Sequence, residues 1–364
     1  MIEDEPSLLV AECDLKTFCA AVLRRVEVPE RDAVEIADNL VEADLRGVHS
    51  HGVVRLPIYT ERLAARATNP RPEVKVVRET ATSLVIDGDN GMGQIVGMRA
   101  MERLIDKAKA SRVCAFAAVR NSNHYGAAAL YAQMACLHDM IGLSFTIGGI
   151  NHMVPWGGAE ALLGNNPFAI AMPAGEKHPV VLDMACSVAA RGKIIVAAKE
   201  GKAIPPDWAV GPDGQPTTDA VEALKGFVSP IAGPKGYSLT LMIGLLSTML
   251  SGAAFGSEVT HMYEDLERPQ NVGHLFGVLP IDLFEDVETY RRRMDKAVRE
   301  MRGARRTPGV ERIYLPGERE YLAMAERKIS GIPLGTGVFG ELNELGARYG
   351  LQLAPMTAPA AREA

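Results

Sequence analysis

The sequence lacks the features that mark several specialised classes of protein. Its five cysteines are scattered and form no CxxC pair, so they predict neither a disulfide framework nor a zinc knuckle and are typical of a reducing compartment. Positive charge is not in excess, because the formal net charge is −6, and this argues against nucleic acid or an anionic membrane as the main partner. The first residues are acidic rather than basic and then apolar, so we expect no cleavable leader. These absences together predict a cytoplasmic protein.

Long hydrophobic runs are scarce. One stretch, from Tyr237 to Phe255, is long and mostly apolar, and the chain holds no second candidate of this kind. Serine, threonine and glycine are interspersed along it, and such small residues let a helix pack closely against its neighbours. The stretch therefore predicts a buried helix rather than a membrane-spanning one.

The overall composition indicates a folded globular protein with more than one lobe. Hydrophobic residues make up 47% of the 364 and charged residues 23%, which is ordinary for a folded chain. A chain of this length is too long for one simple core, so we expect two or three lobes.

The first stretch of the chain is predicted to be helical. Between Pro29 and Gly47, apolar residues recur at helical spacing and form one stripe, with proline suited to the start and glycine to a left-handed end. Asp44 falls on the same stripe. A carboxylate there needs a partner or a functional role, and a local cap or ion pair is the structural alternative.

Strands alternate with helices beyond Pro70–Pro72, and this pattern predicts an α/β fold, a sheet with helices packed on it. Residues 205–218, rich in proline and glycine, are predicted to be a loop, and the last dozen residues a frayed tail. The predicted strands are Val74–Val77, Ser83–Ile86, Val113–Val119, Ile141–Ile147, Phe168–Met172, Val180–Asp183 and Leu275–Pro280. The predicted helices are Gly93–Ala110, Ala127–His138, Val188–Lys199 and Val287–Arg302.

A glycine-rich turn, Gly88 to Gly97, comes after the predicted strand Ser83–Ile86 and Asp87, and precedes a helix. This order is typical of a Rossmann dinucleotide site, where helix amides cradle a pyrophosphate. The glycine spacing is off by one, however, and the next strand is followed by Arg120 instead of an acidic residue that would bind a ribose. We therefore interpret these glycines as a structural turn.

Two histidine loops carry the strongest functional signal. The first loop, His49-Ser50-His51-Gly52, follows the first helical stripe, with Arg55 four residues after His51. The second loop, Asn121–Gly126, contains His124. Each histidine could merely bond to a carbonyl in its own turn. The neighbouring hydroxyl, amide and guanidinium groups favour chemistry instead. A metal site at His49-x-His51 is a further alternative, although no third ligand has an obvious spacing.

An anion site is predicted where Gly233-Pro-Lys235-Gly236 opens the long apolar stretch. The ammonium of Lys235 and the amides of a helix N-terminus both carry positive charge, and a phosphate would suit the two together. A solvated lysine is the structural alternative.

Taken together, these segments resemble the malate/L-lactate dehydrogenase type 2 family. That family also includes ureidoglycolate dehydrogenase, sulfolactate dehydrogenase, diketogulonate reductase and a cyclic-imine reductase branch. The resemblance covers about residues 15 to 335, in the family's order. The matching segments are Glu42–Pro57, Asn121–Gly126, Val154–Gly158, Asn166-Pro167, Leu182–Ala185, Ala190–Ile194, Gly233–Tyr237, Leu250–Phe255 and Leu315–Glu318.

The resemblance implies a non-Rossmann fold, in which a mixed sheet with helices binds NAD or NADP and a helical lobe carries the Ser-His-Gly loop. It implies residues 1–72 as the helical lobe, completed by 317–350, and residues 73–218 with 270–316 as the α/β cofactor-binding domain. Residues 219–269 are then a helical segment. It also implies a homodimer with the active site at the subunit boundary.

The same resemblance implies an enzyme that moves a hydride between nicotinamide and C2 of a small 2-hydroxy or 2-oxo acid. His51 would then be the proton donor, oriented by Ser50, with Arg55 binding the substrate carboxylate; in one branch His124 is assigned the acid/base role. Histidine titrates near working pH, and arginine offers a fork matched to a carboxylate. Further substrate contacts are expected at Asn165 and Arg191. Cofactor contacts are expected at His124, Tyr125, Gly126, Asp183, Met184, Ala185, Lys235, Gly236, Pro316, Gly317 and Glu318.

The chain departs from the family pattern at three places. The imine-reductase branch has an aspartate where this chain has Lys193, which favours the hydroxy-acid reaction over reduction of a cyclic imine. Asn165 replaces the threonine of most members, and residues 146–153 differ from the usual polar loop. These last two departures leave the substrate open. A cyclic-imine reductase and a non-catalytic, metal-binding protein remain as alternatives.

Overall fold

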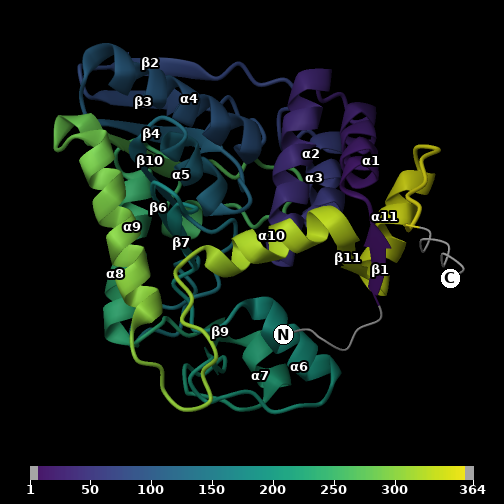
Figure 1. Cartoon of the computed structure of the whole chain (residues 1–364). Helices are drawn as coiled ribbons and strands as arrows, with labels where there is room; N and C mark the ends of the chain where they lie inside the picture. The colour runs from purple at the N-terminus through teal and green to yellow at the C-terminus, as the bar shows by residue number, and fades with distance from the viewer. Residues whose placement is uncertain (1–6, 357–364) are drawn as a thin grey trace, which may run out of the picture. The chain divides into compact units, whose positions relative to one another are not determined.

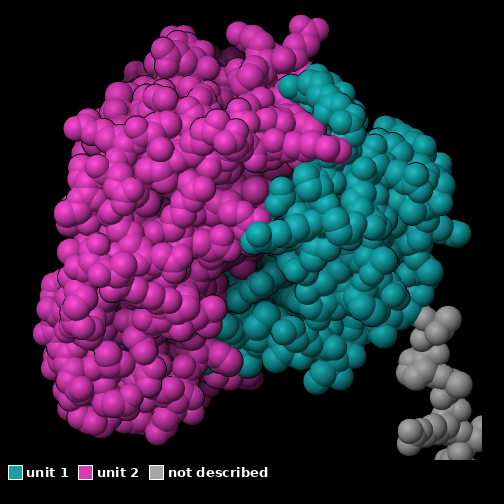
Figure 2. Space-filling model, turned by 90° about the horizontal axis from the view of Figure 1, so that it is seen from above, with its two compact units in different colours: residues 1–66, 318–364 teal, residues 67–317 magenta. Residues whose placement is uncertain are grey.

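The computed structural model describes residues 7–356, with the side chain of Lys199 excepted, so most of the predicted tail lies outside the described residues. The chain forms two compact units, Met1–Arg66 with Glu318–Ala364 and Ala67–Gly317 (Figure 2). The three-part division by sequence, with 219–269 as a separate segment, stays a proposal about folding units.

The first unit is mainly helical. The apolar stripe predicted between Pro29 and Gly47 is α2 (Glu30–Leu45), whose stripe residues are buried, and Gly47 has the left-handed φ of 79° expected of a helix end. A short strand β1 (Ser7–Val10) pairs antiparallel with β11 (Ile332–Gly335), which joins the start of this unit to its C-terminal part. The remaining elements are α1 (Glu12–Arg25), η1 (His49–His51), η2 (Val53–Arg55), α3 (Leu56–Ala64), α10 (Glu318–Ser330) and α11 (Thr336–Ala347).

A seven-stranded mixed sheet forms the centre of the second unit (Figure 1). Its order is β2-β3-β4-β10-β5-β6-β7, and within it only β3 and β4 run parallel. The mixed, non-Rossmann sheet expected from the resemblance is thus confirmed. The strands are β2 (Lys75–Glu79), β3 (Ser83–Asp87), β4 (Ala115–Ser122), β5 (Met140–Thr146), β6 (Phe168–Met172), β7 (Val180–Met184) and β10 (Val272–Pro280).

The predicted elements all occur, with their ends displaced by at most three residues, except that the helix predicted to reach Phe255 ends at Thr248. The helix α6 (Arg191–Lys199) begins three residues after its predicted start at Val188. The amide of Val188 donates instead to the carbonyl of Ser229, so these residues pair in an extended conformation before the helix begins. The predicted loop 205–218 contains a two-residue strand, β8 (Ala209–Val210), paired with β9 (Phe227–Val228). The other helices are α4 (Gly93–Ser111), α5 (Ala128–Cys136), α7 (Ala220–Lys225), α8 (Pro234–Thr248) and α9 (Val287–Gly303), with the short η3 (Gly256–Glu258) and η4 (Ile281–Leu283).

Helices cover both faces of the sheet. On β10, a Cβ at Gly273 would come 2.3 Å from the carbonyl oxygen of Ser247, so α8 packs directly on this strand. The next residue, His274, points to the opposite face because side chains alternate along a strand. There its ring stacks on Tyr125, which in turn stacks on Tyr131 of α5. The α5 side and the α8 side are therefore opposite faces of one sheet.

Most of the long apolar stretch forms α8, and the predicted burial and close packing hold for one side of this helix only. Its buried positions are mostly small or hydroxyl-bearing, such as Thr240, Gly244 and Ser247, because these allow close packing on the sheet. Ile243 is buried as well, but other large apolar side chains lie at helical spacing on the exposed side. These are Leu239, Met242 and Leu246 of α8, with Met249 and Leu250 directly after its end. Among residues 7–356, no helix has both the length and the apolar character needed to cross a membrane.

The glycine turn after β3 packs against protein backbone. The amide of Gly88 donates to the carbonyl of Arg120, and the side chains of Arg120 and Asn121 both donate to Asp87. A Cβ at Gly93, the first residue of α4, would come 2.2 Å from the carbonyl oxygen of Asn123. Another segment of the chain occupies the place where a Rossmann turn would hold a pyrophosphate, which supports the structural interpretation of this turn.

Candidate active site

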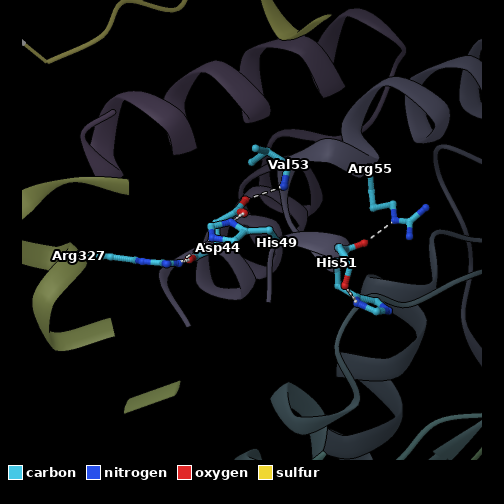
Figure 3. Close-up of polar contacts among 7 residues, drawn as sticks. Asp44, His49, His51, Val53, Arg55 and Arg327 are labelled. Atoms are coloured by element: carbon cyan, nitrogen blue, oxygen red, sulfur yellow. Dashed lines mark hydrogen bonds and ion pairs between the residues drawn. The ribbon is translucent and has the colours of Figure 1, made fainter. Parts of the chain in front are cut away.

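A pair of short 3-10 turns, η1 and η2, presents the first group of predicted site residues. The hydroxyl of Ser50 lies 2.9 Å from Nδ1 of His51, and Nε of Arg55 donates to the carbonyl of Ser50 over 2.6 Å (Figure 3). Burial, and next the positive charge of Arg55, lower the pKa of His51 to about 4. Burial also lowers the pKa of Arg55. The structure thus brings Ser50, His51 and Arg55 together in these two consecutive turns, and the lowered pKa keeps the imidazole neutral at ordinary pH.

Asp44 lies beneath this turn and has partners on both sides. Its side chain is buried, and the carboxylate accepts from Nδ1 of His49 at 2.8 Å and from the amide of Val53 at 2.7 Å. Burial raises the pKa of Asp44, while the bonds from His49 and Val53 act in the opposite direction. The sequence placed this carboxylate in an apolar stripe, and the structure shows which groups compensate its burial.

A metal at His49-x-His51 finds no support in the contacts of these rings. Nδ1 of His49 bonds to Asp44, and its Nε2 lies 3.1 Å from a guanidinium nitrogen of Arg327. Within residues 7–356, no three His, Cys, Asp or Glu side chains are grouped so that they could hold a metal ion.

The second histidine loop belongs to the other unit, at the end of β4. The half-buried His124 is held through its amide by the side chain of Gln270 at 3.5 Å. Gln270 also donates to the carbonyl of Gly149, so it ties this loop to the residues that follow β5. Gly126 has a φ of 82°, which lets the chain turn sharply into α5.

Tyr125, expected to contact the cofactor, has its side chain in the core. Its ring is 1% exposed, stacks between Tyr131 and His274, and its hydroxyl lies 3.0 Å from that of Ser144. Burial raises the pKa of this phenol. Any contact of Tyr125 with a cofactor would therefore come from its main chain.

The segments expected to bind the cofactor in the second unit are connected by hydrogen bonds. Asp183 at the end of β7 accepts from the amide of Ala129 at the start of α5, directly after the His124 loop. The amide of Val181 donates to the carbonyl of Pro316, and a Cβ at Gly317 would come 2.9 Å from the Cβ of Val181. Segments 124–129, 181–185 and 316–317 therefore meet around β7, whereas Glu318 opens α10 in the first unit.

The start of α8 is linked to the same place. The amide of Ile231 donates to the carbonyl of Cys186, which directly follows Met184 and Ala185. Lys235 is exposed in the first turn of α8, and Gly236 packs against the carbonyl of Ile231. The 15-residue α8 thus offers amides and an ammonium close to the Asp183–Ala185 segment, and this set of donors fits the anionic pyrophosphate of a dinucleotide.

Two of the three departures from the family pattern, Asn165 and residues 146–153, lie side by side. A Cβ at Gly148 would come 2.9 Å from Oδ1 of Asn165, so the unusual residue at 165 contacts the unusual stretch 146–153. A Cβ at the next glycine, Gly149, would come 3.5 Å from the Cβ of His124. Sequence spacing could not show that these positions are neighbours.

His152 and Arg191 of the second unit interact electrostatically. Burial, followed by the positive charge of Arg191, lowers the pKa of His152 to about 4. Arg191 opens α6, and one guanidinium nitrogen donates to the carbonyl of Leu224 over 2.6 Å. The sequence singled out Arg191 but missed His152, whose only signal was its place in the divergent stretch.

A cavity of about 630 Å³ lies within the second unit, and its lining residues come from three segments, within 154–159, 206–216 and 228–233, together with Val188. It includes Trp156 and Gly233, which belong to two of the matched family segments. None of the side chains expected to bind substrate lines it.

The comparisons with known proteins agree on the family. The profile described as malate/L-lactate dehydrogenase matches residues 10–343. The chain belongs to this family. A malate dehydrogenase of Pyrococcus horikoshii is 41% identical over 357 residues, which cover 96% of this chain and 98% of that protein. The solved sulfolactate dehydrogenase from Methanocaldococcus jannaschii has a TM-score of 0.88 at 39% identity and covers 95% of this chain and 98% of its own.

Further relatives differ in cofactor and reaction. The ureidoglycolate dehydrogenase (NAD(+)) of Escherichia coli is 36% identical over 88% of this chain and 90% of its own length. The (2R)-3-sulfolactate dehydrogenase (NADP(+)) of Chromohalobacter salexigens is 32% identical over 86% of this chain and 93% of its own length. The solved delta1-piperideine-2-carboxylate reductase from Pseudomonas syringae has a TM-score of 0.82 at 29% identity, and covers 93% of this chain and 99% of its own. The family resemblance is confirmed, and relatives with this fold include a reductase with another kind of substrate.

Proposed function

We propose that this protein is a dehydrogenase that uses NAD or NADP to interconvert a small 2-hydroxy acid and its 2-oxo acid. The observation that carries the proposal is that Ser50 is hydrogen-bonded to both His51 and Arg55, within two consecutive turns of a chain of this family. We further propose a cytoplasmic homodimer, for which the exposed apolar side of α8 and the unpaired cysteines are the supporting features.

His51 is the proposed acid/base. In the oxidation direction, the C2 hydroxyl gives its proton to the neutral imidazole while the C2 hydrogen leaves with its electron pair, so a carbonyl forms at C2. The bound nicotinamide supplies the acceptor for that hydride. The contact from Ser50 to Nδ1 orients the ring, and Nε2 is the atom to which we assign the proton exchange. Reduction of the 2-oxo acid follows the same steps in reverse, with the same residues.

Arg55 is proposed to bind the substrate carboxylate. Its Nε donates to the carbonyl of Ser50, so the side chain is fixed to the turn that carries His51. A guanidinium can pair with a carboxylate in a fixed orientation, and this orientation decides which face of C2 is presented for hydride transfer. A bound carboxylate would also offset the charge of Arg55, and the pKa of His51 would then rise toward the value needed to donate a proton.

The remaining predicted contacts keep their roles as proposals. The N-terminus of α8 with Lys235 and Gly236 would hold the cofactor's phosphates, beside Asp183, Met184 and Ala185. His124 would lie near the reacting groups. Asn165 and Arg191 would contact the part of the acid beyond C2, and His152, which faces Arg191, would join them for an acid with a second anionic group. The main chain of Tyr125 and Gly126, and Pro316, Gly317 and Glu318, complete the proposed cofactor contacts.

The function is tested with a panel of 2-oxo acids and both reduced cofactors, followed by absorbance. His51→Ala should lower kcat by about 100-fold or more, because general acid/base catalysis contributes on this scale, while the cofactor Kd from fluorescence titration stays unchanged. His124→Ala in the same assay decides between the two histidines. A His51→Ala enzyme with the rate of the wild type would contradict the assignment of this residue.

A cyclic-imine reductase is the second candidate, favoured by the structural likeness to the piperideine-carboxylate reductase. Lys193, at the position where the imine branch has an aspartate, argues against it. Turnover of cyclic imino acids together with none of any 2-oxo acid would establish this alternative.

A further inference from the structure

One carboxylate holds both ends of the turn that carries His51. Oδ1 of Asp44 lies 2.8 Å from Nδ1 of His49, just before Ser50, and Oδ2 accepts from the amide of Val53, just after Gly52. Figure 3 shows Asp44 between these two partners. The three residues from Ser50 to Gly52 therefore wrap around a single buried side chain.

The fit between this turn and the carboxylate is tight. A Cβ at Gly52 would come 2.1 Å from Oδ2 of Asp44, a distance that real contacts do not show. The φ of Gly52 is −86°, so the glycine is required by the close approach and not by a left-handed backbone. The carboxylate and the turn could not move apart without losing two hydrogen bonds, nor closer without a clash.

A distant arginine determines which nitrogen of His49 carries the proton. Nη1 of Arg327, in α10, donates to the carbonyl of Asp44 over 2.5 Å and lies 3.1 Å from Nε2 of His49. A guanidinium only donates hydrogen bonds, so Nε2 must accept. The ring proton is then on Nδ1, where it is donated to the carboxylate of Asp44.

We infer that Asp44, His49 and Arg327 form a positioning network for the proposed reaction, in which Arg327 sets the tautomer of His49 and the carboxylate of Asp44 holds the turn that presents His51 and Arg55. This inference rests on the proposed function for its catalytic consequence. The three residues touch no reacting atom in this scheme. They act by fixing the backbone from which the proton-transferring and carboxylate-binding side chains project.

The network predicts an unusual response to Asp44→Asn, a change that barely alters shape. The amide oxygen of the new side chain can still accept from Val53, but its NH₂ group then faces Nδ1 of His49. That nitrogen must become an acceptor, and the ring proton must move to Nε2, where it meets the donor of Arg327. Two donors are opposed wherever the proton goes, so the turn loses its anchor.

The first experiment measures kcat and KM for Asp44→Asn, Arg327→Met and the double variant, each as the full chain. Asp44→Asn should lower kcat at least 10-fold with the cofactor KM within twofold. Arg327→Met removes the opposing donor, so the double variant should recover part of the kcat lost by Asp44→Asn. Asp286→Asn, the same exchange at the N-cap of α9, is the matched control and should leave kcat unchanged. A double variant whose loss equals the product of the single losses would overturn the network.

The second experiment reads the tautomer directly and does not depend on activity. In protein labelled with ¹⁵N-histidine, the ring signals of His49 are identified by their loss in His49→Gln. We expect the proton on Nδ1 in the wild type and a shift of protonation toward Nε2 in the double variant. A wild-type proton on Nε2 would refute the network even if the enzyme is active. If no 2-oxo acid is turned over, the proposed function fails, whereas an Nδ1 proton would still support the network.

Discussion

His49 and His51 are separated by a single residue, and their rings have different partners. The ring of His49 is bonded on both sides, to Asp44 and to Arg327, and lies within a charged network. The ring of His51 contacts a hydroxyl through one nitrogen, and burial, followed by the positive charge of Arg55, lowers its pKa. At this scale, the partners of each ring decide its role, because the two side chains are chemically identical.

The depressed pKa of His51 predicts the pH dependence of the free enzyme. A base must be neutral to accept a proton, and with a pKa of about 4 His51 stays neutral down to roughly pH 5. We expect kcat/KM for oxidation of the hydroxy acid to be level from pH 8 to about 5 and to fall below that. Enzyme held at each pH is assayed again at pH 7.5, so that loss of structure is recognised. An inflection near pH 6.5, the value of an ordinary histidine, would speak against His51 as the base.

At the scale of elements, β10 joins the two halves of the sheet through a buried histidine. Nε2 of His274 bonds to the hydroxyl of Ser122 at the end of β4, at 2.8 Å. Its Nδ1 bonds to the hydroxyl of Thr146 at the end of β5, at 2.7 Å. Beyond these ends lie the His124 loop and the divergent stretch 146–153. The fully buried His274 therefore connects the exits of the two strands that lead into the candidate site.

Burial lowers the pKa of His274 to about 3, and this predicts a loss of stability in acid. Between about pH 6.5 and 3 the unfolded chain binds a proton at this residue and the folded chain does not, so the free energy of unfolding falls as pH falls. The loss at pH 5 is about 2 kcal/mol from this group. Urea unfolding measures the free energy of unfolding at pH 7 and at pH 5. The difference between the two values should be smaller in His274→Gln than in the wild type, by about the same amount.

Phe276→Leu is the matched control for this measurement. Phe276 is fully buried on the same strand and carries no ionisable group, so its truncation should lower stability by a similar amount at both pH values. If the difference in the free energy of unfolding between pH 7 and pH 5 is the same in His274→Gln as in the wild type, His274 does not stay neutral in the folded state.

At the scale of the whole molecule, the exposed side of α8 supports the proposed homodimer. Met242 and Leu246, one helical turn apart, are 53% and 38% exposed, and the exposed Leu239, Met249 and Leu250 continue the same apolar stripe. Contiguous apolar surface of this kind is typical of an interface between proteins.

The dimer is tested by the double substitution Met242→Glu with Leu246→Glu. Light scattering after size exclusion should show a dimer for the wild type and a monomer for the variant, because burying two carboxylates at an apolar contact is costly. Val221→Glu, at an exposed apolar residue of α7, is the control and should stay dimeric. A monomeric wild type, or a variant of unchanged mass, would contradict the proposal.

Local pattern predicted most of the elements and misjudged one helix. The apolar repeat from Pro29 to Gly47 and the alternation of strands beyond Pro72 correspond to α2 and to the strands of the mixed sheet. For α8, the abundance of apolar residues indicated burial. The pattern could not show that the small residues would face the sheet and the large ones the outside, because that depends on what packs against the helix.

The sequence by itself determined where most helices and strands form and that Ser50, His51 and Arg55 lie in one short segment, since these depend on residues close together in the chain. It also determined the family, through the order of several short motifs. Only the tertiary structure decided that Arg327 reaches His49 across 278 positions and that His274 links Ser122 to Thr146. It likewise decided that Asn165 contacts Gly148. Hydrogen bonds act over about 3 Å, so the partners of a buried polar group are set by how distant segments pack, and no local periodicity encodes that packing.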